Sequence, residues 1–129
     1  MSFPLTSLFA VAFGILLLIL WLGVTKHRAR AGISIGEGDD VALHEKIRRH
    51  GNFIEWVPMT LLLMALAEAG GAAAPWLWVA GGLALLGRVL HPFGLSAANP
   101  AHPGRIIGNI GNIVALLLLI GLLVAQALV

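Results

Sequence analysis

The chain has 129 residues, of which 59% are hydrophobic and 11% charged, with a net charge of +2 and a mean hydropathy of +0.95. Soluble domains carry about 25% charged residues, so this composition excludes an ordinary water-soluble domain and predicts an all-α integral membrane protein. The small net charge gives no basis for nucleic-acid binding, and the chain has no cysteine for disulfides, thiolate metal sites or thiol nucleophiles.

Four apolar stretches predict a bundle of four transmembrane helices in a single domain, residues 1–129. We expect the helices at about 3–25, 42–69, 75–91 and 105–128. The first stretch carries no charge, and basic residues follow it instead of preceding it. It therefore resembles a retained helix more than a signal peptide.

The three connections differ in composition. The first is polar and glycine-rich; we expect a loop from Lys26 that ends where the second helix begins, at about Val41. The second, Gly70–Pro75, predicts a tight hairpin, with Pro75 in the first turn of the next helix. The third runs from His91 to Gly104 and contains three prolines, so it cannot be helical throughout.

All basic residues lie in or beside the first and third connections: Lys26, Arg28, Arg30, Lys46, Arg48, Arg49, Arg88 and Arg105. With four spans, these two connections share one side of the membrane. The positive-inside rule places them in the cytoplasm and both termini outside. The alanine- and glycine-rich composition favours a bacterial inner membrane.

A polar face marks the start of the second span. Arg48, Asn52 and Glu55 are spaced i, i+4, i+7 and share one side of a helix, whereas Arg49 and Trp56 point elsewhere. A charge at mid-membrane costs about 2.5 to 3.5 kcal/mol, so we expect Glu55 to face the bundle interior and to have a partner. Two interpretations stay open: a structural ion-pair clip between helices, or a pocket for a small, multiply charged ligand.

Three further polar residues are expected near the same end of the bundle: Arg88 and His91 on the third helix and Arg105 at the start of the fourth. They could converge with the polar face at one depth, although Arg88 and Arg105 could also simply mark topology. The run Gly104–Asn112 predicts close helix packing within or between subunits, with asparagines bonding across helices. None of the five histidines has a metal-ligand spacing, so we expect no metal site.

The run Arg48-x-His50-x-Asn52-x-x-Glu55-x-x-Pro58 resembles the signature of the MAPEG family, the membrane-associated proteins in eicosanoid and glutathione metabolism. The match to its bacterial branch covers nearly the whole chain. The matching positions are the segments Ser34–Asp39 and Gly87–His91, the single residues Glu68 and Gly94, and the pattern Arg105-x-x-Gly108.

The resemblance implies a homotrimer in the lipid bilayer, with sites between subunits, and glutathione as co-substrate. It implies a membrane-bound transferase or peroxidase acting on lipophilic electrophiles, with Arg105 stabilising the thiolate. The residues implied to bind glutathione are Arg48, His50, Asn52, Glu55, Arg88 and His91.

The chain also departs from the family pattern. Active members often carry tyrosines near the third helix and after the motif glutamate, and this chain has no tyrosine. The alternative function is therefore a non-catalytic trimer that binds a lipid or a partner in the cleft between subunits. A small four-helix drug exporter is disfavoured, because such exporters rely on a carboxylate in the first span and this first span has no charge.

Overall fold

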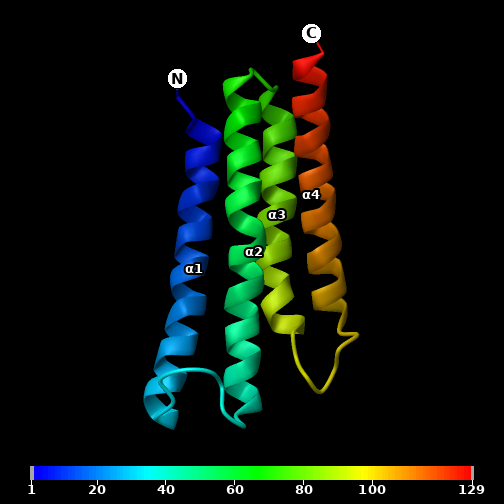
Figure 1. Cartoon of the computed structure of the whole chain (residues 1–129). Helices are drawn as coiled ribbons and strands as arrows, with labels where there is room; N and C mark the ends of the chain where they lie inside the picture. The colour runs from blue at the N-terminus through cyan, green and yellow to red at the C-terminus, as the bar shows by residue number, and fades with distance from the viewer. Residues whose placement is uncertain (1, 129) are drawn as a thin grey trace.

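A computed structural model describes residues 2–128 as four antiparallel helices (Figure 1), and all regular secondary structure in that range is helical. The helices are α1 (Pro4–Ala31), α2 (Val41–Ala69), α3 (Ala74–Gly94) and α4 (Pro103–Ala127). Each is long and apolar enough to cross a membrane, which confirms the predicted all-α, four-span architecture. The α2–α3 hairpin lies at the same end as both ends of the chain, and the two longer connections lie at the other end (Figure 1). We call this second end the basic end.

The expected loop from Lys26 is wrong, because α1 continues for another turn and a half, to Ala31. Nothing between Thr25 and Gly32 breaks a helix, and basic side chains are favourable near a helix C-terminus. The helix ends at Gly32, which adopts a left-handed conformation with φ of 68° and donates its N–H to the Arg28 carbonyl. At the other long connection, α3 runs past its expected end to Gly94 and α4 starts at Pro103.

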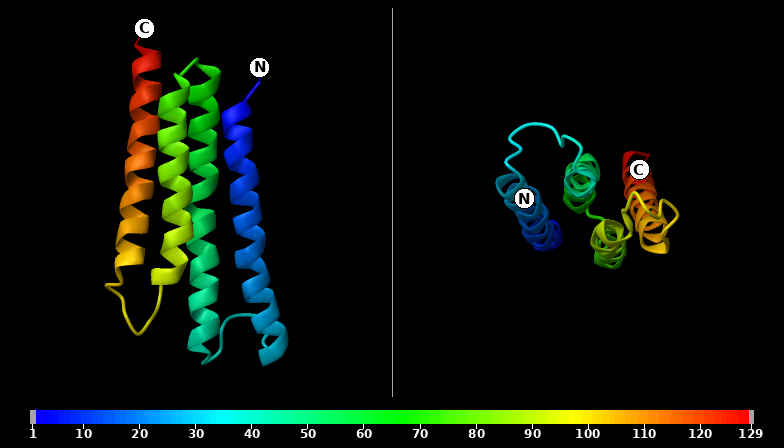
Figure 2. Two further views of the ribbon diagram at one scale, coloured as in Figure 1. Left: turned by 180° about the vertical axis from the view of Figure 1, so that it is seen from behind. Right: turned by 90° about the horizontal axis from the view of Figure 1, so that it is seen from below.

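The helices α2 and α3 occupy the middle of the bundle, and α1 and α4 lie on opposite sides of it (Figure 2). Accordingly, α1 packs on α2 and α3, α4 packs on the same two helices, and α1 does not contact α4 within the described residues. Only 11% of the most apolar 18-residue window of α1 is buried. Its outer surface is therefore left for lipid or for another protein surface.

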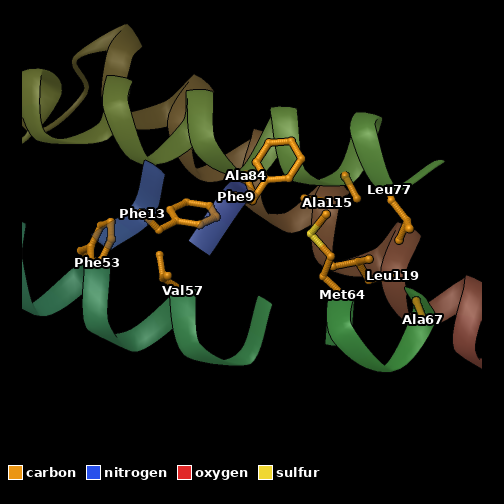
Figure 3. Close-up of a cluster of buried hydrophobic side chains, with 11 residues drawn as sticks. Phe9, Phe13, Phe53, Val57, Met64, Ala67, Leu77, Ala84, Ala115 and Leu119 are labelled. Atoms are coloured by element: carbon orange, nitrogen blue, oxygen red, sulfur yellow. The ribbon is translucent and has the colours of Figure 1, made fainter. Parts of the chain in front are cut away.

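The interior is a single apolar cluster (Figure 3). Toward the basic end, Phe13 of α1 meets Phe53 of α2 edge to face, with ring centroids 6.1 Å apart. Toward the other end, Met64 of α2 packs with Ala115 and Leu119 of α4. The two ends of the cluster thus join α2 to α1 and to α4 respectively.

A carboxylate from α2 holds the start of α1. Glu68 accepts hydrogen bonds from the backbone N–H groups of Leu5 (2.9 Å) and Thr6 (2.8 Å) and from the Thr6 hydroxyl (2.6 Å). The first N–H groups of a helix have no partner within the helix and attract negative charge. Glu68 is therefore a cap that fixes α1 against α2.

Glycines let α3 and α4 approach closely. A Cβ added at Gly108 would lie 2.7 Å from the Gly87 carbonyl oxygen and 3.0 Å from the His91 nitrogen, both backbone atoms of α3. A Cβ at Gly111 would lie 3.2 Å from the Leu83 carbonyl oxygen. The sequence left open whether these glycines pack helices within one subunit or between subunits. In the structure they allow close packing of α3 and α4 within one chain.

We predict that Gly108→Ala lowers the free energy of unfolding by about 1 to 3 kcal/mol, because the new methyl group meets backbone that cannot move aside. The measurement is a denaturant titration of the protein in detergent. The matched control is Gly121→Ala, also on α4, where a Cβ meets nothing within 4 Å. That variant should be neutral or slightly stabilised, because alanine is the better helix former. Equal losses in the two variants would contradict close packing at Gly108.

Candidate functional site

The start of α2 is set by Asp40, which precedes its first turn. The Asp40 carboxylate accepts a hydrogen bond from the Leu43 N–H at 2.9 Å and contacts His27 Nε2 at 2.8 Å. The Leu43 hydrogen bond, and then the His27 contact, lower the pKa of Asp40. The carboxylate thus stays ionised as the helix cap. Because α2 begins at this cap, the cap sets which side of the helix each later polar residue of α2 occupies.

The polar face of α2 points away from the bundle interior. Arg48 and Glu55 approach to 3.8 Å, and their side chains are 49% and 55% exposed. Asn52, between them, donates its side-chain N–H to the Arg48 carbonyl at 3.2 Å. Glu55 therefore has a partner as expected, but the expectation that it faces the interior of the bundle is wrong for a single chain. The partner comes from its own helix, on a face that α1 and α3 leave open.

Arg88 is the charged residue at the centre of the bundle, with 1% of its surface exposed. Its guanidinium donates to the Asn52 carbonyl of α2 at 3.3 Å and to Asn109 Oδ1 of α4 at 3.2 Å. It also lies 5.6 Å from the ring centroid of Trp56. Arg88 thus connects three helices. Trp56 lies under this cation and does not point away from the polar residues, contrary to the sequence-based expectation.

Within the described part of the chain, Arg88 has no direct ion pair with a carboxylate, although Glu55 lies near enough to attract its charge. No acidic oxygen of residues 2–128 lies within 4.0 Å of its guanidinium. Its Nε atom is buried and has no hydrogen-bond partner among these residues. Its direct contacts are with neutral oxygens and an aromatic face, so its unpartnered N–H can still donate to a further anionic group.

His91 lies one turn after Arg88 on α3 and is buried, with its backbone against Gly108 of α4. Arg105 opens the next helix, half-buried, and donates to the Pro100 carbonyl at 3.4 Å. The Arg105 backbone packs on Gly94 of α3. Gly94 is six residues after Arg88, which is about 9 Å farther along the helix axis. Arg105 therefore lies nearer the basic end than Arg88. The expected residues occupy two levels rather than one depth.

His50 lies on a different side of α2. It lines a shallow apolar groove with Leu17, Leu18 and Trp21 of α1 and with Ile54. A larger groove of about 440 Å³ between α1 and α2 shares Leu17 and Ile54 with it and is lined throughout by apolar residues. Ile54 and Pro58, on either side of Glu55 in the sequence, both line this larger groove. An apolar molecule could therefore reach the polar face from the lipid side.

Two members of this cluster were not expected from the sequence. Asn109 confirms the expected bonding of asparagines across helices, but its partner, Arg88, could be identified only from which α4 residue lies level with Arg88. Trp56 was assigned to a different face. Its ring is large enough to reach Arg88 from a position 40° around the helix from Asn52, since successive residues are 100° apart. In the sequence, the only indication of a polar role for Asn109 is its i, i+3 spacing from Asn112.

The fold and the site define a polytopic membrane bundle with a cluster of polar residues around Arg88, toward its basic end. The model of the MAPEG family matches residues 6–125, and the chain belongs to that family. The inner membrane protein YecN of Escherichia coli (strain K12) is 32% identical over 89 residues, which are 69% of this chain and 68% of YecN. The protein of the same name from E. coli O6:H1 matches equally well. No solved structure is significantly similar to the chain.

We predict that Arg88→Ala lowers the free energy of unfolding by about 2 kcal/mol, because it removes two hydrogen bonds between helices and leaves a cavity. A denaturant titration in detergent measures the loss. The control is Arg105→Ala, which removes one long surface hydrogen bond and should change stability by about 0.5 kcal/mol or less. If the two variants were equally stable, Arg88 would not be the connection between the three helices.

Proposed function

We propose that the protein is a glutathione-dependent transferase or peroxidase of the bacterial inner membrane that acts on lipophilic electrophiles as a homotrimer. The observation that carries the proposal is the exposed Arg48–Glu55 pair beside the buried Arg88, whose Nε has no hydrogen-bond partner among residues 2–128. An exposed ion pair in an apolar helix gains nothing from lipid. A neighbouring subunit that covers this face would enclose a charged pocket, as expected for a family whose sites lie between subunits.

The chemistry of the side chains suits glutathione, which has two carboxylates, an ammonium group and two amides. Arginine binds carboxylates through two parallel hydrogen bonds, so Arg48 and Arg88 take the two carboxylates. Glu55 takes the ammonium group, and Asn52 offers its amide oxygen to a peptide N–H. His50 and His91 are assigned to the same ligand by family resemblance alone.

Arg105 stabilises the thiolate in this proposal. A free thiol has a pKa of about 8.5, and a nearby cation favours its ionised form, which is the nucleophile. In conjugation, the thiolate forms a bond to an electrophilic carbon and the leaving group departs with its electron pair. In peroxide reduction, two glutathione molecules become a disulfide while a lipid hydroperoxide becomes an alcohol and water. The apolar groove beside Glu55 is the route proposed for the second substrate.

The membrane orientation is part of the proposal. The eight basic residues of the chain lie at or beside the two long connections, so these connections face the cytoplasm and both termini face outside. The similarity to YecN, an inner membrane protein, supports the choice of membrane. In this orientation the polar cluster opens toward the cytoplasm.

We predict that the detergent-solubilised protein binds glutathione and that Arg48→Ala and Glu55→Ala each weaken binding at least tenfold. Hydrogen bonds to charged groups contribute about 1.5 to 3 kcal/mol, which corresponds to about 10- to 100-fold. A calorimetric titration measures the affinity. The matched control is Glu37→Ala, which removes an exposed carboxylate from the first connection and should bind normally. Absence of binding at millimolar glutathione would exclude the proposed function.

Arg105→Ala separates binding from activation. We expect it to keep most of the affinity but to lose the ultraviolet absorbance of the bound thiolate, which the wild-type protein should show. Arg105→Lys should restore part of that absorbance, because it restores the cation. Binding without thiolate absorbance in the wild-type protein would favour the alternative function, a non-catalytic trimer with a ligand between its subunits.

A further inference from the structure

A third groove lies on another face of α2, between α1, α2 and α3. Its volume is about 540 Å³, within the range of small-molecule sites. Its walls are the α1 segment from Leu16 to Gly23 and the α3 residues Val89, Pro92 and Phe93. Phe93 is 78% exposed at its rim, so the groove opens sideways to the surroundings of the bundle. Arg48 and Glu55 do not line it.

Two cations from α2, Lys46 and Arg49, line the otherwise apolar groove. They are spaced i, i+3 and so point in the same direction. Along the bundle axis, Lys46 lies level with His27 of α1, which it contacts. Phe13 of α1, which packs on Phe53, lies farther from the basic end. The apolar α1 wall lies between these two levels. The groove is therefore cationic at the membrane surface and apolar along its depth.

Lys46 is positioned by its neighbours without being neutralised. Its ammonium lies 2.9 Å from His27 Nδ1, and His27 Nε2 lies 2.8 Å from the Asp40 carboxylate. Because an ammonium group can only donate, Nδ1 accepts and Nε2 carries the hydrogen that His27 donates to Asp40. Among residues 2–128, no carboxylate lies within 4.0 Å of Lys46. Two of its three N–H donors stay available.

Arg49 is held more firmly and supplies a fixed positive wall. Its guanidinium donates to the Leu95 carbonyl at 2.8 and 3.1 Å and to Glu45 at 3.2 Å. Glu45 in turn accepts from Ser96 and from the Ala97 N–H, which turns it toward the third connection. Among residues 2–128, Glu45 is the carboxylate in direct contact with this pair, and Asp40 reaches Lys46 only through His27. Lys46 therefore lines the groove without a direct ion pair.

We propose that this groove binds an anionic phospholipid of the cytoplasmic leaflet, with the phosphate on Lys46 and Arg49 and an acyl chain along α1 and α3. Charge complementarity selects this occupant. An uncharged apolar substrate would leave the available N–H donors of Lys46 unused, and a second copy of the chain has its own excess of basic residues at this level. Basic pockets between transmembrane helices on the cytoplasmic side are suited to anionic headgroups. The site is independent of glutathione binding.

The test is native mass spectrometry of the detergent-purified protein titrated with phosphatidylglycerol or with phosphatidylcholine of identical acyl chains. We expect phosphatidylglycerol to bind about fivefold more tightly, the factor for about 1 kcal/mol from one basic side chain near the membrane surface. Lys46→Gln should remove that preference. The matched control is Lys26→Gln, an exposed lysine near the same end of α1 that does not line the groove. Control and wild type should behave alike.

A second pair of variants tests the acyl-chain part. Gly23→Leu fills the groove, because Gly23 lines it and a Cβ there meets nothing within 4 Å. We expect it to reduce the binding of both lipids. Gly121→Leu adds the same side chain at an equally open position of α4 and should not.

Three results would overturn the proposal. The first is equal loss of phosphatidylglycerol in Lys46→Gln and Lys26→Gln, which would indicate diffuse charge attraction. The second is unchanged lipid binding in Gly23→Leu. The third is a Gly23→Leu protein that changes its oligomeric mass and not its lipid content, because the groove would then be covered by another copy of the chain. Normal glutathione affinity in all four variants shows that the candidate functional site is intact.

Discussion

The structure depends on how a bundle in lipid satisfies one buried guanidinium. Arg88 lies at the centre of the bundle, where an unsatisfied charge would cost several kcal/mol. It is held by the Asn52 carbonyl, the Asn109 amide oxygen and the face of Trp56. These contacts require α4 to lie close to α3, which the glycines at the α3–α4 contact permit. One polar residue therefore sets both the packing of three helices and the position of the candidate site.

The polar residues divide into a buried set and an exposed set with different consequences. Arg88 makes two hydrogen bonds to other helices of its own chain and keeps an unpartnered Nε, whereas Arg48 and Glu55 pair only weakly on an open face. Exposed ion pairs contribute little stability, so this pair is better explained by a ligand or a subunit that covers it than by a structural clip. In the proposed enzyme, Arg88 is a fixed cation in the interior, and Arg48 and Glu55 are exposed charges beside it that can adapt to a ligand. An apolar groove lies along the same helix, α2.

Much of the fold followed from the sequence because membrane spans are set by simple rules of length, apolarity and charge. The four helices were predicted from these rules, and so was the shared face of Arg48, Asn52 and Glu55. The errors came from tertiary contacts. The direction of Glu55 depended on where α1 and α3 pack, the extra turns of α1 depended on Gly32 as its stop, and Asn109 could be matched to Arg88 only by knowing the α3–α4 register. Spacing defines a face of a helix but does not say what lies opposite it.

The central claim is that the Arg48–Glu55 face of one subunit and the interior Arg88 form a glutathione site closed by a neighbouring copy. The most direct measurement is an electron cryomicroscopy structure of the purified protein with glutathione. The account predicts a trimer with one tripeptide in each interface, its carboxylates on Arg48 and Arg88 and its ammonium group on Glu55. A structure in which that face contacts only lipid or detergent, with no ligand near Arg88, would contradict it.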